Sequence, residues 1–583
     1  MPLEPPVRVV RELTSRGYNA DREAVTLLAG ADDPVAAVER AVDEAPADAL
    51  TLTVEHVRGV LEDSTAGSSS HSESAEPEEP ESPDSTTEAP DSVAGASDSA
   101  SGTPDSGSER VAASATASEP TSQPTSQPAA TSTTSSSTGT NSDAEHTTGT
   151  TSAVETKGVS SGGSQTPGTT GRGDATRDVD EDQRSVDVAG DVTGESTGTG
   201  EYKDFVSVFR DRYDRLSKKL RGRVNHRPTD ALDSMPGGSD AAVVGMVNDV
   251  RSTASGHWLV ELEDTNGVFP ALVMKDRDIA EHVDDLLLDE VVAVEGTLSD
   301  DGGIIFADDL YFPDVPRTHD PSTADRHVQA ALVSDVHVGS QEFAADAWDA
   351  FADWLHTEEA EPVEYLLVAG DMVEGVGVYP DQDEELDIVD IYEQYEAFSE
   401  RLKDVPGDME IVMIPGNHDA VRLAEPQPAF DEELRSIMSA HDARFTGNPS
   451  TVTMEGVSVL MYHGVSIDEV IAEHPSEDVS YDNPHRAMAQ LLKKRHVAPQ
   501  FGGRTRLAPE EEDYLVVDEV PDVFHTGHVH KLGVGGYHNV RLVNSGCWQH
   551  QTAFQESVNI DPDVATAPIL DLDTLDVTVR KFV

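Results

Sequence analysis

Five short polar clusters in the second half of the chain contain residue types that bind metal ions and transfer protons. Each cluster follows an apolar run of a few residues. In chain order they are Ser334-Asp335-Val336-His337, Gly370-Asp371, Gly416-Asn417-His418-Asp419, Tyr462-His463-Gly464 and Gly527-His528-Val529-His530. Carboxylate, imidazole and amide oxygen ligands together suit Mn²⁺, Fe²⁺ or Zn²⁺, and one carboxylate can bridge two such ions. The clusters therefore predict a site for divalent metal ions.

Two clusters contain pairs of candidate ligands spaced two residues apart. These pairs are Asp335 with His337 and His528 with His530. In extended backbone, residues spaced by two share a face, so both members of a pair can point into one pocket. A lone histidine is more often a hydrogen-bonded structural residue than a metal ligand. That interpretation fits each histidine singly, but five clusters in succession favour a functional site.

The elements that must position these clusters are short apolar strands with helices between them. The predicted strands are 328–333, 365–369, 410–414, 458–462 and 522–524. Candidate ligands follow each strand, and ligands gather at the carboxyl ends of strands in layered α/β sheets. Residues 326–583 are therefore predicted to form a layered α/β domain with the clusters along one edge.

The first 238 residues divide into three segments. Residues 1–62 have helical patterning and predict a small helical module. Residues 63–200 are rich in Ser, Thr, Gly, Pro, Asp and Glu, so they can bury little apolar surface and predict a long disordered acidic linker. Residues 201–238 predict a helical segment. Its apolar stripe consists of Phe205, Phe209, Tyr213, Leu216 and Leu220.

Residues 239–318 alternate in the manner of a small antiparallel barrel. The predicted strands are 241–250, 258–262, 268–274, 290–298 and 303–311, with a helical stretch at 276–288. Five strands with a helix between the third and the fourth predict an OB-fold. Trp258 and Phe269 are candidates for stacking on single-stranded nucleic acid. A barrel that serves only for docking fits the pattern as well.

Charge and composition limit the classes of protein. The 583 residues include 40 Lys+Arg and 111 Asp+Glu, a net charge of −71, which excludes a basic nucleic-acid-binding protein. A diffuse acidic surface with little lysine predicts a halophilic cytoplasm, where salt screens the repulsion. The single cysteine, Cys547, excludes an internal disulfide and a thiolate zinc cluster. No stretch approaches the ~20 apolar residues of a membrane span, so a cytoplasmic protein without a membrane partner is expected.

The order D-x-H, G-D, G-N-H-D, H and G-H-x-H resembles the calcineurin-like metallophosphoesterase superfamily, whose domain has four layers. The resemblance implies two ion sites that share Asp371. One ion takes Asp335, His337, Asp371 and His530, and the other takes Asp371, Asn417, His463 and His528. It also implies two catalytic residues, the bridging Asp371 and His418, which protonates the leaving oxygen or stabilises the transition state. Asp419 is predicted to orient His418, with a turn residue as the alternative.

Further motifs resemble the small subunits of archaeal family-D DNA polymerases. They lie at 245–249, 262–264, 416–422, 425–429 and 481–485. The resemblance covers residues 201–583 and the N-terminal module. It implies a 3′→5′ proofreading exonuclease with two divalent ions, of which Mn²⁺ is preferred and Fe²⁺, Zn²⁺ or Mg²⁺ are alternatives. It also implies a large catalytic subunit as partner, a single-stranded or mismatched primer 3′ end as substrate, and a place at the replisome or nucleoid. A sliding clamp or primase is a further candidate partner.

Substrate contacts are predicted from the positive charges near these motifs. Arg422 is a candidate for a DNA phosphate, with a surface salt bridge as the alternative. His485 and Arg486 open a basic helical stretch, 484–496, that is a candidate for DNA or partner contact. The acidic segment 381–385 should repel DNA.

Two other functions remain open at this point. A scaffolding subunit of the polymerase with a vestigial metal site explains the barrel but not the complete ligand set. A general metallophosphoesterase explains the ligand set but not the barrel or the linker.

Overall fold

The computed structural model describes residues 184–196, 198–379, 382–557 and 560–582, together with scattered residues between 19 and 57. Most of the predicted module 1–62 and of the predicted linker 63–200 lies outside the described residues. Within the first, β1 (Asn19–Ala20) pairs in parallel with β2 (Thr51–Leu52). No helix in the described part of the chain is both long enough and apolar enough to cross a membrane.

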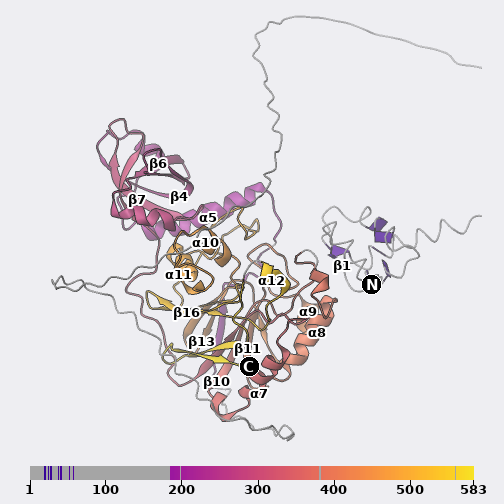
Figure 1. The fold of residues 1–583 in the computed structure, drawn as a ribbon. Coiled ribbons are helices and arrows are strands. Elements are labelled where there is room, and N and C mark those ends of the chain that lie inside the picture. Colours follow the sequence, from indigo (N-terminus) through magenta and orange to yellow (C-terminus); the bar gives the residue numbers. More distant parts are fainter. Residues whose placement is uncertain are drawn as a thin grey trace, which may run out of the picture. The chain divides into compact units, whose positions relative to one another are not determined.

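A closed five-stranded barrel forms the first large element (Figure 1). Its strands are β4 (Asp240–Ser252), β5 (Trp258–Asp264), β6 (Gly267–Val273), β7 (Val291–Leu298) and β8 (Ile305–Tyr311), in the order β4-β5-β6-β8-β7. The predicted helix between the third and fourth strands is the 3-10 helix η2 (Asp278–Asp285). Phe269 is only 3% exposed and belongs to the barrel's apolar core, so the prediction that it stacks on nucleic acid is wrong. Trp258 is half-buried against the same core, and its role in stacking stays a prediction.

Helix α5 (Tyr202–Leu220) lies against the barrel strands β4 and β7, and α6 (Thr229–Leu232) follows it. The apolar stripe of α5 is buried where Tyr213, Leu216 and Leu220 pack on the barrel. At its first turn, Glu201 and Asp204 form a reciprocal capping box, which satisfies backbone N–H groups that would otherwise lack partners.

Two six-stranded sheets form the second half of the molecule. The first has the order β12 (Arg444–Phe445), β11 (Glu410–Ile414), β10 (Val363–Ala369), β9 (Gln329–Val333), β18 (Thr566–Asp571) and β19 (Val577–Lys581). The second has the order β16 (Leu532–Tyr537), β17 (Val540–Ser545), β15 (Val523–Thr526), β14 (Val457–Met461), β13 (Ser450–Met454) and β3 (Val186–Ala189). Strands β9 to β12 are parallel to one another, as are β14, β15 and β17.

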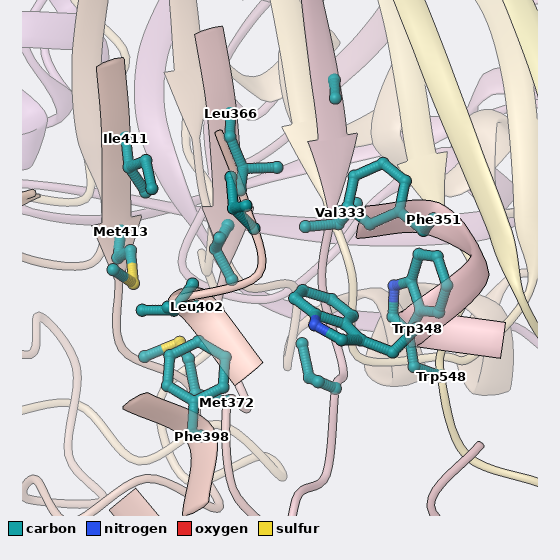
Figure 2. Close-up of a cluster of buried hydrophobic side chains, with 14 of the residues drawn as sticks. Val333, Trp348, Phe351, Leu366, Met372, Phe398, Leu402, Ile411, Met413 and Trp548 are labelled. Atoms are coloured by element: carbon teal, nitrogen blue, oxygen red, sulfur yellow. The ribbon is translucent and has the colours of Figure 1, made fainter. Parts of the chain in front are cut away.

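Helices cover the outer faces of the two sheets. The inner faces pack on each other through one apolar cluster that includes Leu332, Leu367, Val459 and Val523. On the outside of the first sheet lie α7 (Ala345–Leu355), α8 (Ile391–Leu402) and α9 (Glu432–Ile437), which contribute to one apolar cluster. Figure 2 shows part of this cluster, with Trp348 beside Trp548. On the outside of the second lie α10 (Ile467–Glu473) and α11 (Pro484–Lys494). The remaining short helices are η3 (Glu358–Ala360), η4 (Gln382–Glu384) and α12 (Ala553–Ser557).

The end of the predicted linker belongs to this second half. Residues 184–200 were predicted as linker, but β3 pairs antiparallel with β13 along the sheet edge. Beyond β3, Asp191 accepts a hydrogen bond from the Gly447 backbone N–H, and Thr193 accepts one from that of Ala429. The boundary at residue 200 is therefore wrong. Strand β3 has only four residues, two of them valines, and such a short apolar pattern next to a long polar segment did not predict a strand.

Candidate metal centre

The predicted ligands gather just beyond the carboxyl ends of β9, β10, β11, β14 and β15. Five of them have backbone in the left-handed region. These are Asp335 (φ 52°), His337 (φ 56°), Asp371 (φ 52°), His528 (φ 69°) and His530 (φ 54°). Such angles are uncommon outside glycine and cluster at functional sites. The turns that follow the strands thus bend sharply enough to aim these side chains back over the sheet edge.

One group of ligands comes from β9 and β15. Nε2 of His337 lies 3.0 Å from Nε2 of His530 and 3.9 Å from Oδ1 of Asp335. Nε2 of His530 lies 3.5 Å from the same Asp335 oxygen. All three side chains are buried. Nitrogen and oxygen atoms this close can share one metal ion.

A second group surrounds His463, which follows β14. Its Nε2 lies 3.1 Å from Oδ2 of Asp371 and 3.0 Å from Oδ1 of Asn417. The ring of His528 lies beside it, with 5.2 Å between ring centroids. Oδ2 of Asp371 is also 4.0 Å from Nε2 of His337 in the first group. Asp371 therefore faces both groups, as a bridging ligand must.

Glycines keep the centre compact. A Cβ atom on Gly370, whose φ is 91°, would come within 2.4 Å of Nδ1 of His463. A Cβ atom on Gly416 would lie 2.2 Å from Oδ1 of Asp371. Larger residues at either position would displace a ligand.

Hydrogen bonds orient the imidazoles of both groups. Nδ1 of His463 lies 2.9 Å from the carbonyl oxygen of Ala369, which can only accept, so Nε2 is free to bind a cation. Nδ1 of His337 lies 2.8 Å from Oε2 of Glu374. The side-chain amide nitrogen of Gln555 lies 3.0 Å from Nδ1 of His530. A carbonyl partner such as that of Ala369 fixes the tautomer of a metal-binding histidine.

Sequence reasoning missed Glu374. This carboxylate is 1% exposed, and besides its close contact with His337 it accepts a hydrogen bond from Gln549 and lies 3.2 Å from the Tyr379 hydroxyl. It belongs to no strand end and to no motif, and it is one of many acidic residues in the chain. Asp468 was missed for the same reason; its Oδ2 lies 3.6 Å from Nε2 of His528.

His418 lies at the edge of the centre with its side chain 17% exposed. Its Nδ1 donates to the backbone carbonyl of Glu374 at 2.7 Å, and its ring centroid is 4.8 Å from that of His337. Asp419 does not orient this ring as predicted. Its carboxylate accepts hydrogen bonds from the backbone N–H groups of Asp371 and Gly416 and from Tyr395, so it holds the turns that carry the ligands.

The carboxylates and imidazoles of the centre shift one another's pKa values. Burial alone would raise the pKa of Asp371, but the imidazoles of His463 and His418 hold that pKa well below its ordinary value. Burial would lower the pKa of His463, yet Asp371 raises it to about 10. Burial likewise opposes the ionisation of Glu374, and His337 lowers its pKa to about 2. The imidazoles thus supply the positive charge that keeps these buried carboxylates ionised. Separately, carboxylate, imidazole and amide donors are the mixed set that suits divalent metal ions.

The predicted substrate residues are placed differently. The guanidinium of Arg422 pairs with Glu510 at 2.9 Å and donates to the Pro426 carbonyl. The salt bridge that was the alternative for Arg422 is therefore present, and the phosphate contact stays a prediction. Arg486 is exposed on α11, and His485 is half-buried against Gly535.

The rest of the basic stretch anchors the barrel. Nζ of Lys493 lies 2.6 Å from Oδ2 of Asp285, and Nζ of Lys494 lies 3.4 Å from Oε2 of Glu290. These residues therefore join α11 to the barrel instead of offering charge to DNA. In the acidic segment, Asp381 lies outside the described residues, and Gln382 and Glu385 both bond within the loop near Glu374.

Known proteins similar to this chain agree on one family. The model of the DNA polymerase alpha/epsilon B-subunit family matches residues 330–532. The DNA polymerase II small subunit of Halobacterium salinarum is 69% identical over 100% of both chains. The DNA polymerase II small subunit of Archaeoglobus fulgidus is 43% identical over 65% of this chain and 77% of its own. That of Pyrococcus furiosus is 40% identical over 64% of this chain and 62% of its own. The chain therefore belongs to the family of small subunits of archaeal family-D DNA polymerase.

Proposed function

We propose that this polymerase subunit is a metal-dependent 3′→5′ proofreading exonuclease. The observation that carries the proposal is the complete set of seven ligands, drawn from five strand ends and held by buried hydrogen-bond partners. In the same proposal the barrel is an OB-fold, and the two covered sheets form a calcineurin-like metallophosphoesterase domain. The partners are the large catalytic subunit and the single-stranded or mismatched primer end.

The ligand groups would hold two divalent cations, with Mn²⁺ preferred for a mixed set of carboxylate, imidazole and amide donors. One ion would take Asp335, His337, Asp371 and His530, and the other Asp371, Asn417, His463 and His528. When bound, such ions activate water and neutralise charge on the phosphate.

His418 would handle the proton of the leaving group. Its Nδ1–H is held by the Glu374 carbonyl, so Nε2 is the nitrogen that can donate to the 3′ oxygen as the phosphodiester bond breaks. Its partial exposure leaves room for the DNA end, whereas the ligands behind it are buried. Glu374 would act through its neighbours, because it touches both His337 and the loop that holds His418.

The test uses the complex of the full chain with the large subunit, in concentrated salt with Mn²⁺. A primer labelled at its 5′ end and mismatched at its 3′ end should shorten stepwise with the wild type. His418→Ala and Asp371→Asn should abolish shortening while gel filtration shows the complex intact. His327→Ala, an exposed histidine outside the centre, is the matched control and should retain full activity. Full activity in the first two variants would overturn the nuclease proposal and leave a scaffolding subunit.

A further inference from the structure

Two aromatic rings stack on each other beside His418. Tyr379 and Phe554 have ring centroids 5.3 Å apart with 22° between their planes, and the Tyr379 centroid lies 6.4 Å from that of His418. Tyr379 lies in the loop after β10, and Phe554 lies on α12, which Figure 1 labels. The two rings come from segments far apart in the sequence, and each segment also contributes to the metal centre.

Hydrogen bonds tie both rings to the metal centre. The Tyr379 hydroxyl oxygen lies 2.9 Å from Oε2 of Glu385 and 3.2 Å from Oε1 of Glu374, and its one hydrogen is donated between these two carboxylates. The residue after Phe554 is Gln555, whose amide lies 3.0 Å from His530. The loop is also drawn close to His418, since a Cβ atom on Gly375 would lie 2.3 Å from the His418 carbonyl oxygen. The two rings therefore have fixed positions relative to His418.

Burial does not account for this ring pair. Phe554 is 49% exposed, whereas its neighbour Gln555 is buried and bonded. A phenyl ring that only supported the fold would gain stability by turning inward and burying its apolar surface. Instead one face rests on Tyr379 and much of the ring meets solvent. An aromatic face of this kind, next to a reactive centre, is suited to stack on a flat ligand.

Because the charges around the ring pair are negative, a DNA end would be held here mainly by base stacking and not by contacts to its phosphates. The surroundings of the ring pair are acidic, with Glu374 and Glu385 bonded to Tyr379, and Arg422 is already paired with Glu510. Phosphate contacts also weaken steeply in salt. Base–aromatic stacking needs no positive charge and tolerates any base sequence.

We propose that Tyr379 and Phe554 form a platform on which the unpaired base at the DNA 3′ end stacks, bringing the last phosphodiester to His418. The inference rests on the proposed nuclease function and deepens it. A base that remains paired is already stacked within the duplex, so the platform favours frayed or mismatched ends over matched ones.

The first measurement is binding without turnover. The complex with the large subunit, carrying His418→Ala, is titrated with single-stranded DNA whose 3′-terminal base is fluorescent 2-aminopurine. A single strand of the same sequence, but with an abasic nucleotide at its 3′ end, serves as the competitor. The base-bearing end should bind about 5- to 150-fold more tightly than the abasic end, the ratio that corresponds to stacking worth ~1–3 kcal/mol per base. The fluorescence of the bound 2-aminopurine should be quenched by stacking.

Variants then show which residues cause the preference for the base-bearing end over the abasic end. Phe554→Ala should remove most of this preference, and Phe554→Tyr should retain it because an aromatic ring remains. Phe306→Ala, a ring 41% exposed on the barrel, is the matched control and should retain it. In the complex with His418 intact, Phe554→Ala should slow the removal of base-bearing ends and leave that of abasic ends unchanged.

Each contrary result overturns a different statement. If Phe554→Ala weakened binding and removal equally for base-bearing and abasic ends, or changed neither, the platform would be overturned. Stepwise hydrolysis by the wild type would still support the nuclease proposal. Release of the large subunit from Phe554→Ala would mean that the ring is a subunit contact. A base preference in a complex that never hydrolyses DNA would instead overturn the nuclease and leave the platform as a binding site.

Discussion

His337 shows how much one side chain in this centre depends on its neighbours. Its ring nitrogens face opposite ways, Nε2 toward His530 and Nδ1 toward Glu374. Burial lowers the pKa of His337, which keeps the ring available as a neutral ligand. Glu374 counteracts this lowering and fixes the ring's direction, so the metal affinity of the centre should depend on a residue that binds no metal itself.

Glu374→Gln should weaken Mn²⁺ binding by about 10- to 100-fold, the usual effect of losing a partner behind a metal-binding histidine. The amide keeps the size of the side chain but removes the charge that faces His337. Calorimetric titration of the metal-free chain with Mn²⁺ measures the change. Glu385→Gln is the matched control, because Glu385 shares only the Tyr379 contact. Equal affinity in both variants would show that Glu374 does not position His337.

Glu425 makes stability depend on pH. Burial raises the pKa of Glu425 to about 8, although Tyr462 donates a hydrogen bond to it. The folded chain therefore holds a proton that the unfolded chain releases near pH 4.5, so this group stabilises the fold less as the pH rises from about 4.5 to 8.

In Glu425→Gln the decrease in stability that this carboxyl causes as the pH rises should disappear, because the amide does not ionise. Its Tm relative to the wild type should therefore rise between pH 5 and pH 8, as measured by thermal denaturation at constant salt. A difference in Tm that stays constant with pH would contradict the predicted protonation.

The candidate ligands could be predicted because each follows a strand, and strands leave a clear apolar pattern. Asn417 and His463 lie 46 positions apart, yet both lie at the ends of such runs. Glu374 and Gln555 could not be predicted, since they reach the centre from loops and a five-residue helix with no periodicity. The ion pair between Arg422 and Glu510 could not be predicted either, because the two residues are 88 positions apart and no local pattern links them.

At the scale of elements, the barrel strands and most sheet strands lie where alternation and apolar runs predicted them. Strand β11 (Glu410–Ile414) has the predicted bounds. The 3-10 form of η2 and the short edge strand β3 depend on tertiary contacts, so local patterns did not reveal them. The basic stretch around Lys493 was assigned to DNA or a partner, but its ion pairs are with the barrel.

Helix α5 joins the barrel to the sheets through Arg212, and this contact should be important for stability. The guanidinium is 0% exposed, its Nε lies 2.6 Å from Oδ2 of Asp513, and it also donates to the carbonyl of Asp289. Arg212→Ala would leave the buried Asp513 carboxylate without its arginine, with contacts only to His496 and the Leu515 backbone N–H among the described residues.

Loss of this contact should destabilise the chain by about 3–5 kcal/mol, the usual cost of stranding a buried charge. Urea denaturation measures the change, and Arg210→Ala, an exposed arginine on the same helix, should fall within about 0.5 kcal/mol of the wild type. A similar small change in both variants would show that the buried pair does not hold α5 in place.

At the scale of the whole molecule, a net charge of −71 should make stability depend on salt. Raising KCl from about 0.1 M to about 1 M shortens the screening length from about 10 Å to about 3 Å, which weakens the repulsion among carboxylates. The Tm followed by circular dichroism should rise across this range. Sucrose, which stabilises by exclusion but does not screen charge, should raise it less. A Tm that stays level or falls with KCl would contradict this view of the acidic surface.

The left-handed turns at the metal centre bear on natural selection. Each of the five ligands in that conformation costs on the order of 1 kcal/mol relative to a glycine, in a fold whose whole margin is about 5–15 kcal/mol. If these positions had no function, substitution of Asp335 or His528 by glycine or asparagine would stabilise the fold, because those residues tolerate left-handed backbone better. Such substitutions would then accumulate by drift. A lineage that abandoned the chemistry should therefore lose these residues quickly. Five such residues gathered at one sheet edge are therefore hard to explain by the stability of the fold alone.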